Sequence, residues 1–449
     1  MSPDTMASHW CRVVLLVLPV VLGALLLLPR PWQPVPEECW SAPAPAVPDL
    51  PEPALAQREY QVVLFGATGF TGRLVAQYLS RRLAGTGIAW AVAGRSEGRL
   101  EKLVASLPEA EASGVGIVVA DAGDLEALKA MALRTTVVAS AAGPYTKYGS
   151  LLVQAAAEAG THYADLSGEF FWERRMIDRF GDAAVQSGAK IVFSCGYDSI
   201  PFDLGALMAL DKFRSAYPGG QPEQVVSVVR RSRGWLSGGT LSAIREVGRQ
   251  VYEGIESLVD YRDPYLLVPN ATCRPDSDVS GWGPLPRFDL DTQTLGVQHF
   301  MAAINARVVR RSFSLLPGLA ACRYAEGMSL ASIVDAMRFL AGFWADLPLA
   351  PQPGQGPPEG VLVHGEGRVE VFALGRDRAQ KSTVQVWFNG DMGYNCTSKM
   401  LAEAALCLAD PSCHSRPGGG MLTPASAMGH HLVERLQQAE GGTFMGFEG

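Results

Sequence analysis

The residues of this chain whose spacing most clearly suggests chemistry are Gly66, Gly69 and Gly72. They follow an apolar run, VVLF, which we expect to be a buried strand, and they precede an amphipathic helix. In such a turn backbone N–H groups can approach a pyrophosphate at the positive end of the helix, and side chains at the glycines would block it. The spacing is G-x-x-G-x-x-G rather than the commoner G-x-G-x-x-G, so the strand–turn–helix context supports the prediction. We predict a dinucleotide site at Gly66, Ala67, Thr68, Gly69, Phe70, Thr71 and Gly72.

The end of the next expected strand, 88–93, indicates which dinucleotide is bound. An NAD enzyme usually has Asp or Glu there to hold the ribose 2′-hydroxyl. This strand instead leads into Gly94, Arg95 and Ser96. The planar guanidinium of Arg95 suits a phosphate, and Ser96 can add a hydroxyl. We therefore predict NADP(H); the alternative is that Arg95 is a solvated loop charge.

The alternation of strands and helices continues and predicts a Rossmann-type doubly wound parallel sheet. Ligands of such sheets lie beyond the carboxyl ends of the strands, so the turns there should face one crevice. Asp121 can reach the adenine side, whereas Ala142, Gly143 and Pro144 are expected near the nicotinamide ribose. The expected strands are 116–120, 136–142, 162–166 and 190–195, and the expected helices 124–133, 151–159 and 170–187. The turns in question are at Gly66, Gly94, Asp121, Gly143, Ser167 and Gly196.

Residues close to this crevice are candidates for proton donation during hydride transfer. Tyr145 and Lys147 follow the Gly-Pro turn, where a phenol or an ammonium could donate a proton or polarise a carbonyl. Tyr145 could equally pack at the turn, with one hydrogen bond. Tyr197 and Asp198 form a second candidate pair, although Asp198, just before Ile200 and Pro201, could instead be a helix N-cap. His162 is expected to be structural because it opens an apolar strand.

Two other patterns bear on the reaction. No Tyr-x-x-x-Lys occurs in the chain, which disfavours short-chain dehydrogenase chemistry. The SGGT sequence at 237–240 precedes an expected helix and could form an anion or carbonyl nest or simply cap that helix. The eight cysteines show no zinc spacing, so we expect no metal, and they resemble small apolar core residues in a reducing compartment.

The organisation expected from the sequence has five parts. Residues 59–214 form the NADP(H)-binding Rossmann domain, 215–425 an α+β substrate domain, and 426–449 a tail that packs back on the core. The second domain is expected to contain a strand at 225–231, helices at 240–258, 294–312, 329–345 and 394–409, and a hairpin of 369–374 with 383–388.

The N-terminal part differs in composition from the rest. Residues 1–30 include an uncharged apolar run from Val13 to Pro29, and residues 31–58 form a Pro-rich linker. Seventeen residues are about the minimum for spanning a hydrocarbon core. We favour a membrane anchor over a cleaved targeting peptide. The chain of 449 residues has a net charge of −7 and lacks a sustained cationic stripe, so nucleic acid is not an expected partner.

Seven ordered motifs between Tyr60 and Gly442 resemble those of the saccharopine dehydrogenase-like oxidoreductase family. They are GATGFTG, AVAGRS, AAGPYTKYG, GTHYADLSGE, GYDSIPFDLG, SGGT and GGGMLTPASAMG. This group includes the mycobacterial trans-acting enoyl reductases and an animal lipid-droplet-associated member. The resemblance implies a Rossmann domain with NADP(H), an α+β domain, and reduction of a lipid-like or polyketide-like substrate. An amino-acid substrate would need cationic clamps for its carboxylates, and no convincing set is found in the sequence.

Three functions remain open at this point: an NADP(H)-dependent reductase of a hydrophobic acyl or enoyl substrate at a membrane, a saccharopine-type amino-acid dehydrogenase, and a non-catalytic NADP-binding scaffold on a membrane or lipid droplet. The expected partners are a small hydrophobic substrate and, through the N-terminal segment, a membrane; a homodimer is also considered. The expected location is a membrane of the endoplasmic reticulum, a lipid droplet or another organelle, with the catalytic domain on a reducing side.

Overall fold

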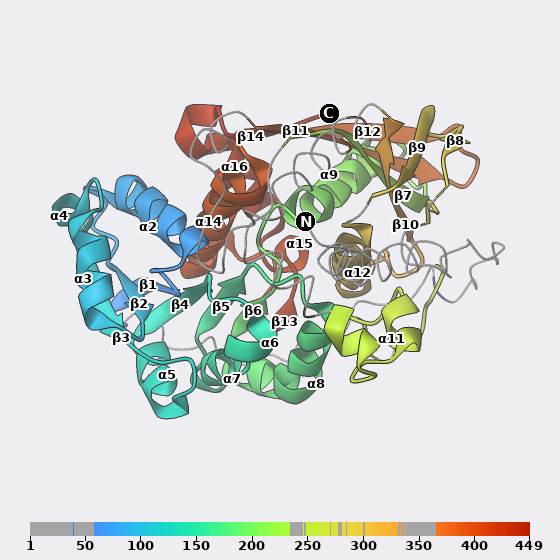
Figure 1. The fold of residues 1–449 in the computed structure, drawn as a ribbon. Coiled ribbons are helices and arrows are strands. Elements are labelled where there is room, and N and C mark those ends of the chain that lie inside the picture. Colours follow the sequence, from blue (N-terminus) through green and yellow to red (C-terminus); the bar gives the residue numbers. More distant parts are fainter. Residues whose placement is uncertain are drawn as a thin grey trace, which may run out of the picture.

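The computed structural model describes Cys39 and residues 58–233, 246, 248–269, 271–276, 281–283, 285–299, 301–330, 334, 337 and 365–449. Two seven-stranded sheets lie side by side in this part of the chain (Figure 1). One large hydrophobic core contains side chains from both sheets, including Val62 of the first and Val371 of the second. The two sheets therefore share a core rather than standing as separate folding units.

The first sheet is parallel throughout and confirms the expected doubly wound class. Its strands are β1 (Tyr60–Phe65), β2 (Trp90–Gly94), β3 (Val115–Val119), β4 (Thr135–Ser140), β5 (His162–Asp165), β6 (Lys190–Val192) and β13 (Gly420–Leu422). Their order is β13-β6-β5-β4-β1-β2-β3, with each neighbouring pair parallel. This is the 3-2-1-4-5-6 order of dinucleotide-binding sheets with one strand added. Because the strands are parallel, the turns after β1 to β6 all lie at one edge.

Helices cover both faces of this sheet, as Figure 1 shows. On one face lie α2 (Phe70–Leu83) and α14 (Thr397–Ala409); on the other lie α5 (Leu125–Ala132), α7 (Ser150–Ala159) and α8 (Phe170–Ser187). Local signals set the helix ends. The carboxylate of Asp124 accepts hydrogen bonds from two amides of α5, and Gly160 and Gly188 end α7 and α8 in the left-handed conformation. The shorter helices here are α3 (Glu97–Ala105), α4 (Ala110–Ser113) and α6 (Tyr145–Tyr148).

The second sheet is mixed and confirms the expected α+β part. Its order is β14-β12-β11-β7-β10-β9-β8. The strands are β7 (Pro222–Arg233), β8 (Arg287–Asp289), β9 (Thr294–Gln298), β10 (Arg323–Ser329), β11 (Glu366–Gly375), β12 (Lys381–Asn389) and β14 (Met445–Glu448). The antiparallel pairing of β11 with β12 confirms the expected hairpin. Helices α9 (Ile200–Ala216) and α12 (Ala302–Leu315) pack on this sheet, and α11 (Leu258–Arg262) lies beyond α12.

Two strands near the C-terminus belong to other sheets than the expected domain boundaries imply. Strand β13 lies inside the expected substrate domain, 215–425, but it pairs with β6 of the first sheet. In the opposite sense, β14 lies in the expected tail and pairs with β12 of the second sheet. Thus β13 joins the first sheet only after six strands of the second sheet, β7 to β12, and β14 then completes the second sheet. The remaining C-terminal elements are η4 (Met392–Cys396), η5 (Pro411–Cys413), α15 (Pro424–Ala427), α16 (Gly429–Gln438) and η6 (Ala439–Gly442).

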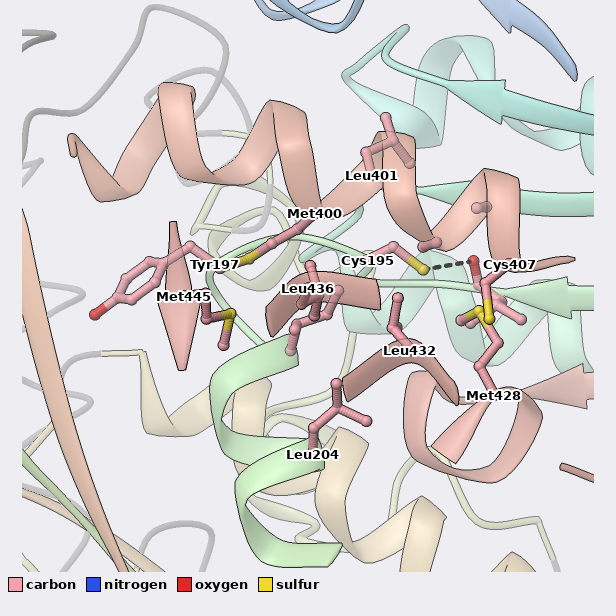
Figure 2. Close-up of a cluster of buried hydrophobic side chains, with 14 of the residues drawn as sticks. Cys195, Tyr197, Leu204, Met400, Leu401, Cys407, Met428, Leu432, Leu436 and Met445 are labelled. Atoms are coloured by element: carbon pink, nitrogen blue, oxygen red, sulfur yellow. Dashed lines mark hydrogen bonds between the residues drawn. The ribbon is translucent and has the colours of Figure 1, made fainter. Parts of the chain in front are cut away.

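Figure 2 shows how closely this returning segment packs. Met400 and Leu401 of α14 and Leu432 and Leu436 of α16 surround Cys195, which follows β6. All of these side chains are buried. The tail therefore contributes to the core, as expected for residues 426–449.

Some expected elements differ from the structure. The helix expected at 294–312 begins as strand β9, and α12 starts only at Ala302. Val297 is half-buried and Leu295 exposed, so the apolar residues at the start of this segment do not form one buried helical face. Large parts of the helices expected at 240–258 and 329–345 lie outside the described residues, as does the SGGT sequence at 237–240.

The expectation that the cysteines are unpaired core residues in a reducing compartment is wrong for one pair. Cys39 and Cys273 form a disulfide, with their Cα atoms 5.5 Å apart, whereas the five other described cysteines are free and buried. Cys39 is itself buried against Ala320 and Ala321. Disulfides persist mainly in oxidising surroundings, so this pair does not support a reducing compartment. It also shows that Cys39 of the Pro-rich segment is packed in a buried cluster with residues of the second half of the chain.

The apolar run from Val13 to Pro29, expected as an anchor, lies outside the described residues. Among the helices that are described, none combines the length and the hydropathy needed to cross a membrane.

Candidate dinucleotide-binding active site

The turn after β1 brings two strand ends into contact. Gly66 has φ +78°, and a Cβ built on it would lie 2.9 Å from the Cβ of Ala142 in the turn after β4. A Cβ on Gly72 would lie 2.3 Å from the carbonyl oxygen of Gly66. Glycine is therefore required at both positions. At Gly66 the reason is the backbone conformation, and at Gly72 it is the close approach of α2 to the turn.

Gly69 differs from these two glycines because the space beside it is open. Its extended conformation, φ −70° and ψ 170°, is accessible to any residue, and its Cβ would meet only one atom, Gly66 O at 3.3 Å. No side chain caps α2, and its first turn contains no acidic residue. Within the described residues the amides of Phe70 and Thr71 donate no hydrogen bond. The arrangement leaves a positive helix end with free N–H groups, as a pyrophosphate requires.

At the end of β2 the predicted phosphate ligands lie in the open. Arg95 is exposed, and no carboxylate or other acceptor pairs with it in the described part of the chain. Ser96 is the N-cap of α3, yet its side chain makes no capping bond. An unpaired guanidinium and an unused hydroxyl at this strand end fit a ribose 2′-phosphate.

The other predicted cofactor residues lie at the same edge of the sheet. Asp121 follows β3 and its carboxylate accepts a hydrogen bond of 2.8 Å from the Gly123 amide, so part of its capacity shapes the turn. Ala142, Gly143 and Pro144 follow β4, and the Gly143–Pro144 peptide is cis. Ala67, in contrast, is completely buried, so only its backbone is available to a ligand. The structure thus brings together the turns that the sequence predicted separately.

Tyr145 is a structural residue in this conformation. Its side chain is 5% exposed, its hydroxyl donates to the carbonyl of Ser140 at 2.9 Å, and it accepts from the Leu166 amide at 3.1 Å. Burial raises its pKa well above the usual value. The hydroxyl therefore connects the turns after β4 and β5, and the alternative of packing with hydrogen bonds is what the structure shows.

Lys147 and Tyr197 have different surroundings. Lys147 is exposed, with its ammonium 5.1 Å from the ring centroid of Tyr148. Tyr197 is buried and belongs to the apolar cluster of Figure 2, and its ring packs edge-on against Phe388 with centroids 5.2 Å apart. Its hydroxyl has no partner in hydrogen-bonding geometry among the described residues, although Ser232 lies near enough to lower its pKa against the larger effect of burial, which raises it.

Sequence reasoning missed the role of Glu169. Its carboxylate accepts hydrogen bonds from the Tyr145 and Thr146 amides at 2.6 and 2.9 Å and also contacts the Thr146 hydroxyl. It thus caps α6 from a distant turn and fixes the loop that follows Pro144. Because the cap comes from 24 residues away in the chain, no local pattern could have revealed it.

A second group of acids lies behind the turn after β5. Burial raises the pKa of Asp165 to about 7 and that of Glu173 to about 8. Asp165 accepts from the Ser167 and Ser194 amides, and Glu173 from the Ser194 hydroxyl. Glu173, Ser194 and Arg311 line a small internal cavity. Both carboxyls are enclosed, so they support the turn rather than face the crevice.

A parallel sheet in dinucleotide order, with a glycine turn leading into an uncapped helix, defines a nucleotide-dependent oxidoreductase of the Rossmann type. Residues 62–192 match the saccharopine dehydrogenase NADP binding domain family. The chain therefore carries an NADP-binding domain.

The curated relatives extend this likeness over most of the chain. A trans-acting enoyl reductase of Mycobacterium ulcerans is 34% identical over 414 residues, which are 85% of this chain and 97% of that protein. A Mycobacterium tuberculosis relative, provisionally given the same name, is 37% identical over 85% of this chain and 96% of its own length. The chain belongs to the saccharopine dehydrogenase-like oxidoreductase family, as its motifs indicated.

Among solved structures, the apo saccharopine dehydrogenase (L-Glu forming) of Saccharomyces cerevisiae shares the fold. It superposes with a TM-score of 0.50 at 13% identity, covering 87% of this chain and all of that one. At this identity the likeness concerns the fold alone.

The glycine turn yields a first prediction. Gly69→Val should weaken NADPH binding at least 100-fold with an unchanged melting temperature, because the valine occupies ligand space only. Gly72→Val should weaken binding and also destabilise the fold by about 1–3 kcal/mol, as overpacking does. Titration calorimetry and thermal unfolding measure the two effects. Gly181→Val, at an open position of α8, is the control, and normal NADPH binding by Gly69→Val would contradict the pyrophosphate assignment.

A second prediction concerns cofactor choice. Arg95→Asp should weaken NADPH binding at least tenfold, about 1.4 kcal/mol, and shift the preference towards NADH, because an anion replaces the phosphate-pairing cation. Arg81→Asp, an equally exposed reversal at the far end of α2, should leave both affinities unchanged. Unaltered NADPH affinity in Arg95→Asp would show that the 2′-phosphate lies elsewhere.

Proposed function

We propose that this oxidoreductase is an NADPH-dependent reductase of a hydrophobic acyl or enoyl substrate at a membrane. The observation that carries the proposal is the likeness, over 85% of the chain, to proteins named trans-acting enoyl reductases. The crevice supports it, because an open glycine turn and an unpaired Arg95 suit NADPH, which supplies a hydride when bound.

The residues at the turns after β1, β2 and β4 have separate parts in this function. The amides that begin α2 would bind the pyrophosphate, and Arg95 with Ser96 the 2′-phosphate. Glu169 and Tyr145 hold the loop beyond Pro144 and so orient the nicotinamide side of the crevice.

The buried arginines of α12 weigh against an amino-acid substrate. They are the strongest candidates among the described residues for a carboxylate clamp. Arg307 instead donates to backbone carbonyls of Tyr261, Asp263 and Ala303, and Arg311 to those of Leu267 and Met421. Arg310 pairs with Asp276 at 2.6 Å. These arginines hold the chain together and leave little capacity for a second carboxylate.

Turnover tests the proposal directly. The full-length protein in detergent micelles should oxidise NADPH in the presence of 2-enoyl thioesters, and the product should contain two additional hydrogens by mass spectrometry. Its kcat/KM should rise with acyl length, since each buried methylene contributes about 0.8 kcal/mol.

The competing functions predict other outcomes in the same assay. Oxidation of NADPH only with oxo acids and amino acids would indicate a saccharopine-type enzyme. Tight NADPH binding without turnover of enoyl, acyl or amino-acid substrates would indicate a scaffold. The Gly69→Val protein is the cofactor-free control for each substrate.

The membrane part of the proposal rests on the uncharged run from Val13 to Pro29. The full chain should sediment with membranes and resist carbonate extraction, as a spanning helix does. A chain without residues 13–29 should be released, and it retains Cys39, so the disulfide is left intact. Native protein that starts between residues 30 and 58 by N-terminal sequencing would show a cleaved targeting peptide instead.

A further inference from the structure

Outside the predicted residues, a buried polar cluster lies where β10, α12 and the turn after β6 meet. Glu326 of β10 is completely buried, and its Oε1 lies 2.6 Å from His299 Nδ1 and accepts a 2.8 Å hydrogen bond from Asn305 Nδ2. Its Oε2 accepts from the Tyr324 hydroxyl at 3.0 Å. The His299 ring also stacks on Phe202 of α9, with centroids 5.7 Å apart. The imidazole is therefore held on two sides.

Asp198 lies in the turn that leads into α9, the helix whose Phe202 stacks on this histidine, and His299 acts electrostatically on the Asp198 carboxyl. Asp198 is not the cap of α9, because Ser199 occupies the N-cap position. Asp198 is half-buried, and its carboxyl makes no hydrogen bond with any described residue. Burial raises its pKa to about 6, an effect that His299 reduces and Glu326 reinforces. A carboxyl so placed is protonated in part near neutral pH.

Unsatisfied polar atoms lie on this turn and in the cluster beside it. The Tyr197 and Ser199 hydroxyls on the turn and the Asn305 side-chain oxygen are buried without a hydrogen-bond partner among the described residues. Buried polar groups are rarely left without partners. Two of these residues flank Asp198 in the chain, which indicates a place where polar ligand atoms or water bind.

The turn also lies at the ligand edge of the sheet. A Cβ on Gly196, where the turn begins, would contact the side chain of Leu166 at 3.0 Å, just beyond β5. Strands β4, β5 and β6 are neighbours, so Asp198 lies at the same edge as the Gly143–Pro144 turn. In sheets of this order the nicotinamide half of the cofactor lies over that region.

We propose, on the basis of the reductase function above, that Asp198 is the proton donor of the reaction and that His299, fixed by Glu326, is its positioning residue. Two electrons and a hydrogen reach the β-carbon of the enoyl thioester as hydride from NADPH, which becomes NADP⁺. The π electrons of the C=C bond move to the α-carbon and thioester oxygen as an enolate. The Asp198 O–H bond then breaks, its proton bonds to the α-carbon, and the carboxylate regains a proton from water.

Substitution of the carboxyl separates this role from a structural one. Asp198→Asn keeps the side-chain volume and should lower kcat at least 100-fold, within the range for loss of a general acid, while the NADPH Kd changes less than twofold. In D₂O the wild type should place deuterium on one face of the α-carbon of a 2-methyl-2-enoyl thioester. The variant should yield both faces, because solvent then protonates the enolate. Asp211→Asn, farther along α9, is the matched control and should retain full kcat.

The proposal is overturned if Asp198→Asn keeps half of the wild-type kcat, loses NADPH affinity in parallel, or still places deuterium on a single face. A wild type that reduces no enoyl thioester would contradict the proposed function, and a second measurement then decides on Asp198 alone. In the full chain with carboxyl-labelled aspartate, the NMR signal absent from Asp198→Asn should titrate near pH 6, and His299→Gln should move that titration upward. An ordinary titration near pH 4, or one unmoved by His299→Gln, would refute the pairing.

Discussion

The contact between Gly72 and the carbonyl of Gly66 constrains the rest of the dinucleotide half. Helix α2 can press against the turn after β1 only because residue 72 has no side chain. This contact sets the direction of the first amides of α2, which remain free for an anion. The positive φ of Gly66 then brings the same turn against Ala142, so that the ends of β1 and β4 share one wall.

The opposite side of α2 is held by a segment more than 300 residues later in the chain. Glu403 of α14 is completely buried and accepts hydrogen bonds from the Tyr78 hydroxyl, from Arg82 and from Arg435 of α16. Removal of one partner from such a buried charged group typically costs about 3–5 kcal/mol. The C-terminal return thus fixes the cofactor helix, and the same helix α14 lies in the core that both sheets share.

Buried ionisable groups fall into two kinds in this structure. Tyr145, Glu169, Glu403 and the arginines of α12 are hydrogen-bonded within the chain and support loops and helices, although Arg311 Nε has no partner among the described residues. Asp198 and Tyr197 lie at the ligand edge with capacity unused. Burial shifts the pKa values of both kinds, so a shifted pKa does not by itself distinguish a structural residue from one that takes part in the reaction. The hydrogen-bond partners of the residue distinguish the two.

The sequence by itself determined six strands of the first sheet, β1 to β6, its glycine turn and the preference for NADP. These depend on local patterns: an apolar strand, glycines at fixed spacing, and a cation where an acid would otherwise stand. The sequence also predicted the β11–β12 hairpin from alternation around a polar turn. The tertiary structure decided what depends on residues far apart in the chain. The return of β13 to the first sheet, the disulfide of Cys39 with Cys273, and the Glu169 cap on α6 have no local signal. For the same reason His299 and Glu326 went unnoticed, and the sequence left Tyr145 open between proton donation and packing, whereas its hydroxyl makes two hydrogen bonds to the backbone. Tertiary packing decides which side chains of a folded chain contact or hydrogen-bond each other. A sequence pattern shows only which residue types could do so.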